Sequence, residues 1–290
     1  MDETTFTFAG TDGAEISAYR WAGDGPPKAI VQIAHGMGEH AARYRRLAEA
    51  LTDAGYVVYA NDHRGHGRTA GTPDRHGDLG AGGWPGLVDD LGVLGDLARR
   101  EYPGIPLVLV GHSMGSFALQ CYLLDHSADI DAAVLSGTSA LDVISSAIDP
   151  TQDVDLSAFN APFEPARTEY DWLSRDPDEV DLYVADPACG FGLNPDSTAS
   201  MLAGSGDTAN GERLAGIRPD LPIYLLSGDA DPLAGGGALI ELVADRYREG
   251  GVRDVTVAIY PGARHEVFNE TNRDEVTTEL IEWLDRVATA

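Results

Sequence analysis

The sequence predicts an α/β fold in which helices cover both faces of a mostly parallel sheet. Short apolar runs recur along the 290-residue chain, separated by longer segments whose apolar residues follow the helical period. The runs are nearly continuous instead of alternating, as in parallel strands that are buried on both faces. Such an alternation of strands and helices is typical of a doubly wound sheet.

The apolar runs and periodic segments place the expected elements. We expect strands at residues 29–34, 56–60, 106–110, 132–135, 222–226 and 255–260. Helical periods cover residues 39–54, 87–101, 114–125 and 238–249, and a last helix begins at about Arg273. In that last helix the apolar residues from Val276 to Val287 form one stripe.

The alternation stops between residues 138 and 206. This segment is rich in Asp, Pro and Ser, but it contains too many aromatic residues to be a solvated linker. They are Phe159, Phe163, Tyr170, Trp172, Tyr183 and Phe191. We interpret it as a helical cap inserted over the carboxyl edge of the sheet, where α/β folds bind their ligands. The predicted domains are therefore a core of residues 1–137 and 207–290 and a cap of residues 138–206.

The charge balance excludes one class of partner. The chain has 20 Lys and Arg against 47 Asp and Glu, a formal net charge of −27, and Lys28 is the only lysine. This charge repels phosphate backbones and anionic lipid surfaces, so we expect no nucleic-acid partner. The hydrophobic fraction of 43% is typical of a folded globular protein.

The remaining composition indicates a cytoplasmic protein with reduced thiols. The first residues lack the basic and apolar regions of a signal peptide, and no stretch of 18 apolar residues occurs. We therefore expect a cytoplasmic location and no stable membrane anchor. Cys121 and Cys189 are too few and too far apart for a disulfide framework or a zinc site, and we expect both to pack as small hydrophobic residues.

A tight turn between an expected strand and an expected helix carries the candidate nucleophile. The strand at 106–110 leads into Gly111, His112, Ser113, Met114 and Gly115, and a helical period follows. A Gly-x-Ser-x-Gly pattern in this context is a nucleophile elbow, in which small residues flank the serine and its hydroxyl rises above the sheet. We therefore expect Ser113 to be a nucleophile.

A serine hydroxyl needs a base, and the base needs an orienting carboxylate. In this fold the three residues follow the chain order Ser, Asp or Glu, His. His265 is the histidine that lies after Ser113 and at a strand end, so it is the expected base. Asp229 and Asp231 both follow the strand at 222–226, and the residues alone leave open which of them orients His265. The other is expected to be a turn aspartate.

Hydrolysis also requires N–H groups that stabilise an oxyanion. One expected donor is the backbone of Met114, directly after the nucleophile. The other is expected in the loop at 34–40, where Gly36 and Gly38 leave the backbone accessible and Met37 lies between them. The alternative is that these two glycines only form a tight turn before a helix. We refer to residues 34–40 as the oxyanion loop.

Other conspicuous residues have structural interpretations. Glu39, Arg43 and Tyr44 are expected in the first turns of the helix beside the oxyanion loop, and we expect them to support the loop. His63 and His66 lie in a Gly-rich loop, but no cluster of carboxylates and histidines completes a metal site around them. The sequence therefore predicts neither a metal nor a cofactor.

Together these motifs resemble those of the monoacylglycerol lipase and lysophospholipase branch of the α/β-hydrolases, which is related to the serine aminopeptidases. The resemblance spans about residues 29–270, and the stretch at 171–176 with Asp186, Pro187, Cys189 and Gly190 resembles bacterial members of this branch. The motifs that carry it are His35-Gly36-Met37-Gly38-Glu39-His40 with Arg43-Tyr44, Asp62-His63-Arg64-Gly65-His66-Gly67, Gly111-His112-Ser113-Met114-Gly115, Gly228-Asp229-Ala230-Asp231 and Gly262-Ala263-Arg264-His265.

The resemblance implies an α/β-hydrolase fold and assigns the site residues. It implies Ser113 as nucleophile, Asp231 as orienting acid, His265 as base, and the backbones of Met37 and Met114 as oxyanion donors. It therefore favours Asp231 where the residues alone gave two candidates. The side chain at the position of Met37 varies within the family, so only the backbone role carries over.

We therefore expect a cofactor-independent serine hydrolase that acts on a small amphiphilic carboxylic ester through an acyl-enzyme. The aromatic cap and the resemblance indicate a substrate with one acyl chain, such as a monoacylglycerol. The alternatives are a lysophospholipase, a general short-chain carboxylesterase, a peptidase or amidase, and a non-catalytic ligand-binding module. An epoxide hydrolase or dehalogenase of this fold would carry an aspartate in place of Ser113. Any membrane contact is expected to be transient and to occur through the cap.

Overall fold

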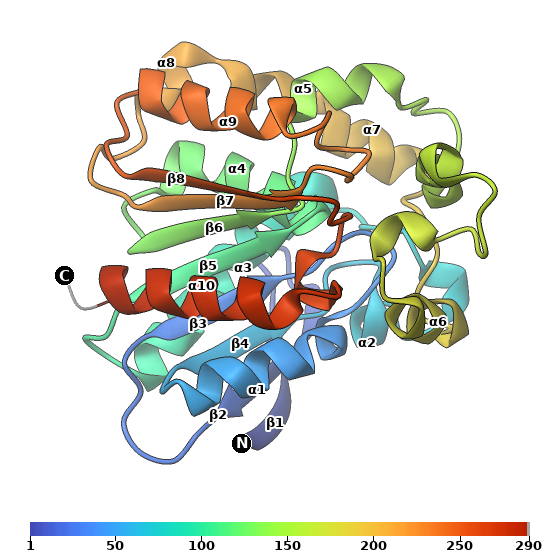
Figure 1. Ribbon diagram of the computed structural model, residues 1–290. Helices are drawn as coiled ribbons and strands as arrows, with labels where there is room; N and C mark the ends of the chain where they lie inside the picture. Colours follow the sequence, from blue (N-terminus) through green and yellow to red (C-terminus); the bar gives the residue numbers. More distant parts are fainter. Residues whose placement is uncertain (289–290) are drawn as a thin grey trace.

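The computed structural model describes residues 1–288, which form one sheet with helices on both faces (Figure 1). The eight strands lie in the order β1-β2-β4-β3-β5-β6-β7-β8. Strands β1 and β2 pair antiparallel, β2 pairs antiparallel with β4, and the other neighbours are parallel. The strands are β1 (Asp2–Ala9), β2 (Glu15–Ala22), β3 (Ile30–Ala34), β4 (Val57–Asn61), β5 (Leu107–His112), β6 (Ala132–Ser136), β7 (Ile223–Gly228) and β8 (Val255–Tyr260).

Helices α1 and α10 cover one face of the sheet, and α3, α4 and α9 cover the other (Figure 1). The α-helices are α1 (Arg45–Asp53), α2 (Gly67–Ala70), α3 (Gly83–Glu101), α4 (Met114–His126), α5 (Leu141–Ile144), α6 (Pro177–Ala185), α7 (Pro195–Ala203), α8 (Gly211–Leu214), α9 (Ala238–Glu249) and α10 (Arg273–Val287). Short 3₁₀ helices are Ala41–Tyr44, Pro73–Arg75, Ser145–Ala147, Leu156–Phe163, Asp171–Leu173, Ser205–Ala209 and Val267–Asn269.

The central strands explain why their sequences are continuously apolar. Successive side chains of a strand point to opposite faces of the sheet. In β5, Leu107 and Leu109 pack into the core beneath α3 and α4, whereas Val108 and Val110 pack into the core beneath α1 and α10. Both faces are therefore buried, and each such side chain contributes about 1.5–3 kcal/mol of burial free energy.

All six predicted strands are confirmed to within two residues, and the expected α/β fold is confirmed with them. The prediction missed the N-terminal hairpin of β1 and β2. Strand β1 lies at the sheet edge and buries only part of one face, through Phe6 and Phe8, so its sequence alternates and contains no continuous apolar run. The sheet is consequently mixed at this end.

Two helix starts differ from the prediction. The helix expected at 39–54 begins as the 3₁₀ turn Ala41–Tyr44 and becomes regular only at Arg45. The helix expected from residue 87 begins at Gly83, since the apolar period starts only after Trp84, Pro85 and Gly86. The later helices α4, α9 and α10 begin at the predicted residues.

Strands β6 and β7 are joined by a long helical insertion over the carboxyl edge of the sheet (Figure 1). It has a small core of its own, in which Leu156, Trp172, Leu173 and Tyr183 are buried together. Helix α7 of this insertion packs against α3. The domain boundaries at 138 and 206 stay a prediction.

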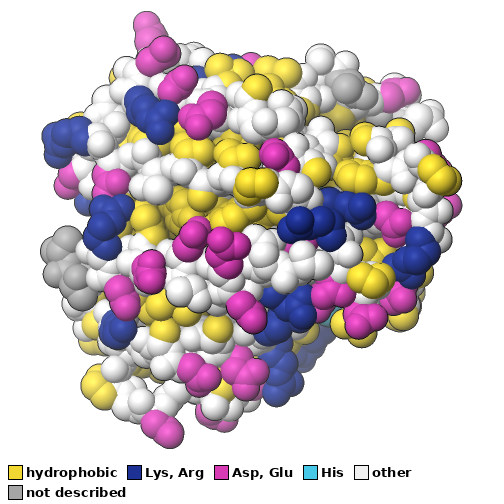
Figure 2. All heavy atoms as spheres, in the orientation of Figure 1, with side chains coloured by type: hydrophobic (Ala, Val, Ile, Leu, Met, Phe, Trp, Pro, Cys, Tyr) yellow, Lys and Arg dark blue, Asp and Glu magenta, His cyan; other side chains and the backbone are white. Residues whose placement is uncertain are grey.

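The surface is predominantly acidic, as the composition requires (Figure 2). Asp and Glu side chains are spread over the visible face, and an apolar band follows β8 between α9 and α10 (Figure 2). Strand β8 is half-buried because it lies at the second edge of the sheet. Within residues 1–288, no helix combines the length and the apolar content that a membrane crossing requires.

Candidate active site

Ser113 lies in a strained turn between β5 and α4. Its φ and ψ angles are 49° and −119°, and no other residue except glycine has a positive φ among residues 1–288. A Cβ atom on Gly111 would lie 2.5 Å from the carbonyl oxygen of Gly115, and a Cβ on Gly115 would lie 2.2 Å from that of Ala34. The turn therefore requires both glycines, and strain of this kind is concentrated at functional sites.

The loops after β7 and β8 bring one aspartate to the candidate base. Nδ1 of His265 lies 2.8 Å from Oδ2 of Asp231, and both residues are buried. The Ser227 hydroxyl donates to the same Oδ2 at 3.2 Å, and the Leu233 N–H donates to Oδ1 at 2.9 Å, so the carboxylate is fixed. Asp229 instead accepts the Gly262 N–H at 2.6 Å in a turn. Of the two candidates, Asp231 contacts the imidazole.

Ser113 and His265 line the same cavity, which encloses about 610 Å³ including its opening to solvent. Within the described residues, no hydrogen bond joins the Ser113 hydroxyl to the His265 ring. Catalytic hydrogen bonds are often long in the absence of substrate and shorten when it binds. Ser113 and His265 therefore face one cavity, but the hydroxyl and the imidazole are not hydrogen-bonded in the substrate-free protein.

The charges around His265 favour its protonated form. Burial lowers the pKa of His265, but the Asp231 carboxylate and its hydrogen bond raise it, and so do the charges of Glu266 and Glu39. The raising effects prevail, so the pKa lies above the ordinary imidazole value. An imidazole of this kind suits a base that must accept a proton and hold it until a leaving group takes it.

The oxyanion loop is held from the side of the core as predicted. The Gly36 N–H donates to Oε1 of Glu39 at 2.6 Å, and the Tyr44 hydroxyl donates to the same oxygen at 2.8 Å. Met37 follows at the cavity wall, and in the described part of the chain nothing accepts its N–H. Met114 also lines the cavity and is the first residue of α4, so its N–H has no partner within the helix.

Arg43 lies between two carboxylates beneath the cavity. Its guanidinium donates to Oε2 of Glu39 at 2.6 Å and to both oxygens of Glu266 at 2.6 and 2.8 Å. Burial raises the pKa of Glu266, but Arg43 outweighs this and lowers it to about 2. Burial raises the pKa of Glu39, and Arg43 compensates only in part. Arg43 and Glu266 therefore form the stronger pair.

Sequence reasoning missed Glu266, although it directly follows His265. It also missed Tyr183, Asp186 and Trp172 as neighbours of the site. The backbone N–H of His265 donates to the Trp172 carbonyl at 3.3 Å, and the centroids of the two side-chain rings lie 4.8 Å apart. The sequence offered two signals for the cap, the density of its aromatic residues and the resemblance of residues 171–176 and 186–190 to bacterial relatives, but neither tells which side chains reach the site.

His63 and His66 lie in a cluster with His35, as hydrogen-bonded loop residues. The His63 N–H donates to Nε2 of His35 at 2.9 Å, and His66 Nδ1 lies 2.8 Å from the Arg64 carbonyl oxygen. Burial lowers the pKa of His63 to about 3 and that of His66 to about 4. Both imidazoles are therefore neutral near pH 7.

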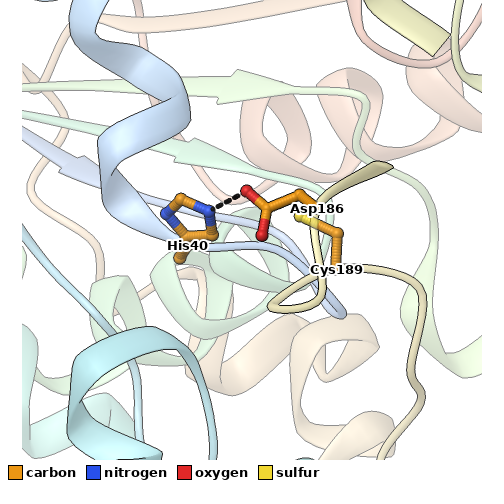
Figure 3. Close-up of side chains that lie close together, drawn as sticks. All are labelled: His40, Asp186 and Cys189. Atoms are coloured by element: carbon orange, nitrogen blue, oxygen red, sulfur yellow. Dashed lines mark hydrogen bonds and ion pairs between the residues drawn. The ribbon is translucent and has the colours of Figure 1, made fainter. Parts of the chain in front are cut away.

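Among residues 1–288, two groups of side chains have the spacing that a metal ion would need. The first is His40, Asp186 and Cys189, in which Nε2 of His40 lies 2.9 Å from Oδ2 of Asp186 (Figure 3). Burial raises the pKa of the Cys189 thiol, whereas a metal binds the thiolate, so this donor set does not fit a metal well.

The second group is Glu39, His112 and Glu266. Arg43 already binds both of its carboxylates, and its guanidinium supplies the positive charge between them. A divalent cation would have to displace that side chain, so this donor set also does not fit a metal.

The wall of the cavity combines two kinds of side chain. Four lining residues are polar: Glu39, His112, Tyr183 and Glu266. A larger set is apolar and includes Phe117, Leu141, Ile144, Ile148, Val154, Leu156, Phe159, Met201 and Leu233. An outer cavity shares five of these apolar residues, Ile144, Ile148, Val154, Phe159 and Leu233, and continues to a rim of Asp149, Gln152, Asp153 and Asp155. An apolar path thus leads from Ser113 to an acidic surface.

Comparison with known proteins identifies the family. Residues 25–272 match the family described as serine aminopeptidase, S33. The chain belongs to this family of α/β-hydrolases. The match covers most of the chain, including β3 to β8, the insertion and every candidate site residue.

Similar proteins include enzymes with lipase names. This chain is 34% identical to a monoacylglycerol lipase of Mycolicibacterium smegmatis, over 96% of its own length and 95% of that protein. It is 32% identical to the monoglyceride lipase of Mus musculus over 96% of this chain and 90% of that protein. Among solved structures, a thermostable carboxyl esterase from Bacillus coagulans in complex with glycerol has a TM-score of 0.88, 30% identity and 99% coverage of both chains.

Proposed function

We propose that this hydrolase cleaves carboxylic esters of lipids with a single acyl chain, and monoacylglycerols in particular. The observation that carries the proposal is that Ser113 lies in one cavity whose wall is largely apolar and also contains Glu39, His112, Tyr183 and Glu266. A monoacylglycerol combines the same two kinds of surface, since it has one acyl chain and two hydroxyl groups. The names of the similar lipases support the same substrate.

In the proposed mechanism, Ser113 attacks the acyl carbonyl while Nε2 of His265 takes the hydroxyl proton. The histidine then returns a proton to the departing alcohol, and the acyl-enzyme is hydrolysed by water that the same histidine activates. Asp231 holds Nδ1 of His265 at 2.8 Å, which fixes the tautomer and stabilises the imidazolium. The N–H groups of Met37 and Met114 bind the oxyanion. The proposal requires neither a metal nor a cofactor.

The apolar part of the cavity explains why the substrate should carry an acyl chain and why it should carry only one. Each methylene buried there contributes about 0.8 kcal/mol at most, so affinity rises with chain length until the path reaches the rim. A triacylglycerol would have to place two further chains against the inserted cap of residues 138–206, which covers the carboxyl edge. We therefore expect a preference for one-chain esters.

The acidic rim and the acidic surface disfavour the approach of anionic lipids to the cavity. Asp149, Asp153 and Asp155 lie where the apolar path opens, and they add locally to the net charge of −27. Salt at about 0.15 M screens charges beyond about 8 Å, so the rim affects groups that pass close to it. An anionic lysophospholipid is therefore the less favoured substrate, and this separates the lysophospholipase alternative from the monoacylglycerol lipase.

The peptidase alternative is less well supported. An aminopeptidase needs an unpaired carboxylate for the ammonium group of its substrate. The two carboxylates that line the cavity, Glu39 and Glu266, are both bound by Arg43. A non-catalytic binding module has no need of the strained Ser113 or of the pairing between Asp231 and His265, so these features favour an enzyme.

The test is kcat/KM on monoacylglycerol, triacylglycerol and lysophosphatidylglycerol of matched chain length, with p-nitrophenyl esters of increasing length. We expect monoacylglycerol to be the best substrate of the three. Ile144→Trp should narrow the apolar path and move the preference to shorter chains, since Ile144 lines both cavities. Val143→Trp is the matched control, because Val143 is the neighbouring residue of α5 and is 41% exposed. Preferential hydrolysis of triacylglycerol, or of aminoacyl amides, contradicts the proposal.

A further inference from the structure

The insertion contacts the oxyanion loop directly. The Gly38 carbonyl oxygen accepts the Tyr183 hydroxyl at 2.8 Å and the Gly190 N–H at 3.0 Å. Both donors belong to residues 183–191, which we call the cap segment. Gly38 has a φ of +65°, in the region that only glycine adopts freely, so its own conformation does little to fix the loop. The two hydrogen bonds therefore supply the restraint.

A second contact lies two residues further along the loop. Nε2 of His40 is 2.9 Å from Oδ2 of Asp186, which reaches it from the cap segment (Figure 3). The other oxygen of Asp186 accepts the Ala188 N–H at 2.9 Å, and its carbonyl accepts the Cys189 N–H at 3.0 Å. These hydrogen bonds fix Asp186 in a turn, so its carboxylate fixes the position of the His40 ring.

The two surfaces pack without space between them. A Cβ atom on Gly38 would lie 2.3 Å from the Phe191 carbonyl oxygen and 2.8 Å from Cδ1 of Leu156. Both of these residues belong to the insertion between β6 and β7. The oxyanion loop therefore lies against the insertion on one side, and on the other the side chain of its own Glu39, which Arg43 and Tyr44 bind, holds Gly36.

Met37 lies between these two restraints. The Gly36 N–H is bound to Glu39 from the core, and the Gly38 carbonyl is bound by Tyr183 and Gly190 from the cap segment. The Met37 N–H shares a peptide group with the Gly36 carbonyl, which lies 2.7 Å from Nδ1 of His35, and the Gly38 carbonyl lies two peptide groups further along the loop. Releasing the cap-side contacts would free this second anchor, so that the loop after Met37 could move.

We propose that Tyr183 and Asp186 are positioning residues for hydrolysis, because they fix the oxyanion loop through Gly38 and His40. The proposal rests on the proposed function and adds to it. The cap segment then controls the rate of the chemical step for every ester, in addition to any selection among substrates. Tyr183 and Asp186 act through the loop and do not themselves take part in proton transfer.

The size of the effect follows from what an oxyanion donor contributes. Removing one donor outright lowers kcat by about 10²–10³-fold. Loosening the loop that carries it should cost a part of this, about tenfold for each contact. The loss should fall on kcat and not on KM, because the oxyanion exists in the transition state and not in the bound substrate.

The experiment uses p-nitrophenyl acetate, whose two-carbon acyl group and aromatic leaving group need neither the apolar path nor a glycerol subsite. We expect Tyr183→Phe and Asp186→Ala each to lower kcat about tenfold with KM nearly unchanged. Asp186→Asn should recover most of the activity, since an amide oxygen still accepts a hydrogen bond from His40. The rate of modification by a fluorophosphonate should fall in parallel, since its P=O oxygen binds the same N–H groups.

The matched control is Asp181→Ala. Asp181 lies on α6 two residues before Tyr183 and pairs with Arg167 at the cap surface, away from the oxyanion loop. The Asp181→Ala substitution removes another aspartate of the cap together with its surface ion pair, and the kcat of this variant should equal that of the wild type. Thermal melting confirms that each variant is folded, and Tyr183→Phe removes only one hydroxyl group.

Two further outcomes keep the proposals apart. If the wild type does not hydrolyse p-nitrophenyl acetate, or if Ser113→Ala still does, the proposed function fails. If the wild type and Ser113→Ala behave as expected but Tyr183→Phe and Asp186→Ala keep the wild-type kcat on acetate, the positioning role is overturned. A loss confined to KM on monoacylglycerol overturns it as well, because it would indicate contact with the substrate headgroup.

Discussion

Arg43 binds both carboxylate oxygens of Glu266, at 2.6 and 2.8 Å, directly beside the candidate base His265. The pairing keeps Glu266 ionised in a buried position, where burial alone would favour its neutral form. A permanent negative charge is thereby placed next to the imidazole. The charge of Glu266 should therefore affect how the activity depends on pH, through the pKa of His265.

We expect activity to rise with pH through an apparent pKa above the ordinary imidazole value of about 6.5, because the base acts in its neutral form. Glu266→Gln removes one of the charges that raise the pKa of His265, so the rising limb should move to lower pH. The measurement is kcat/KM for p-nitrophenyl acetate from pH 5 to 9. A limb that moves upward, or does not move, contradicts the assigned charge effect.

Ser113 should be the single site of covalent modification. Its strained position at the cavity exposes the hydroxyl to acylating reagents. Mass spectrometry after treatment with a fluorophosphonate should find the label on Ser113, and Ser113→Ala should be neither labelled nor active. Labelling that persists in that variant would point to another nucleophile.

Asp231→Asn should lower kcat by about four orders of magnitude, since an amide at this position favours the wrong imidazole tautomer. Asp229→Asn is the matched control, because the Asp229 carboxylate accepts the Gly262 N–H in a turn, whereas Asp231 contacts His265. It should cost at most a few-fold in kcat. Equal losses from the two substitutions, in folded proteins, would remove the distinction between them.

Gly115→Ala should destabilise the protein, because the added Cβ would lie 2.2 Å from the Ala34 carbonyl oxygen and the backbone of β3 cannot easily move. Overpacking of this kind costs about 1–3 kcal/mol or more. Gly204→Ala is the control: its φ is −95° and no other atom lies within 4 Å of the added Cβ. Urea unfolding should show a loss only for Gly115→Ala, and equal midpoints would contradict the steric argument.

The central strands could be predicted from sequence because both faces of the sheet are covered, which makes each strand continuously apolar. Strand β1 could not, because an edge strand with one exposed face shows only an alternation around Phe6 and Phe8. The same limit applies to the first turn of the helix expected at 39–54, where a 3₁₀ turn and a regular helix share one apolar period.

The candidate nucleophile and base could be found because each occupies a local pattern at a strand end. Asp229 and Asp231 share one loop, and only the fold separates them, by turning Asp231 toward His265 and Asp229 toward Gly262. The cap contacts could not be predicted, because the pattern around Asp186 gave a resemblance but no partner. Tyr183 meets Gly38 across 145 positions of the sequence, so nothing near either residue indicates the hydrogen bond.

The position of Lys28 has a practical consequence for immobilising the enzyme. It precedes the amino end of β3, whereas Ser113 and the insertion lie at the carboxyl edge of the parallel strands. As the only lysine, 45% exposed and paired with Asp285, it offers one defined side-chain amine for covalent coupling. An amine-reactive support should therefore hold the molecule by the end opposite its cavity and leave the entrance open to dispersed substrate.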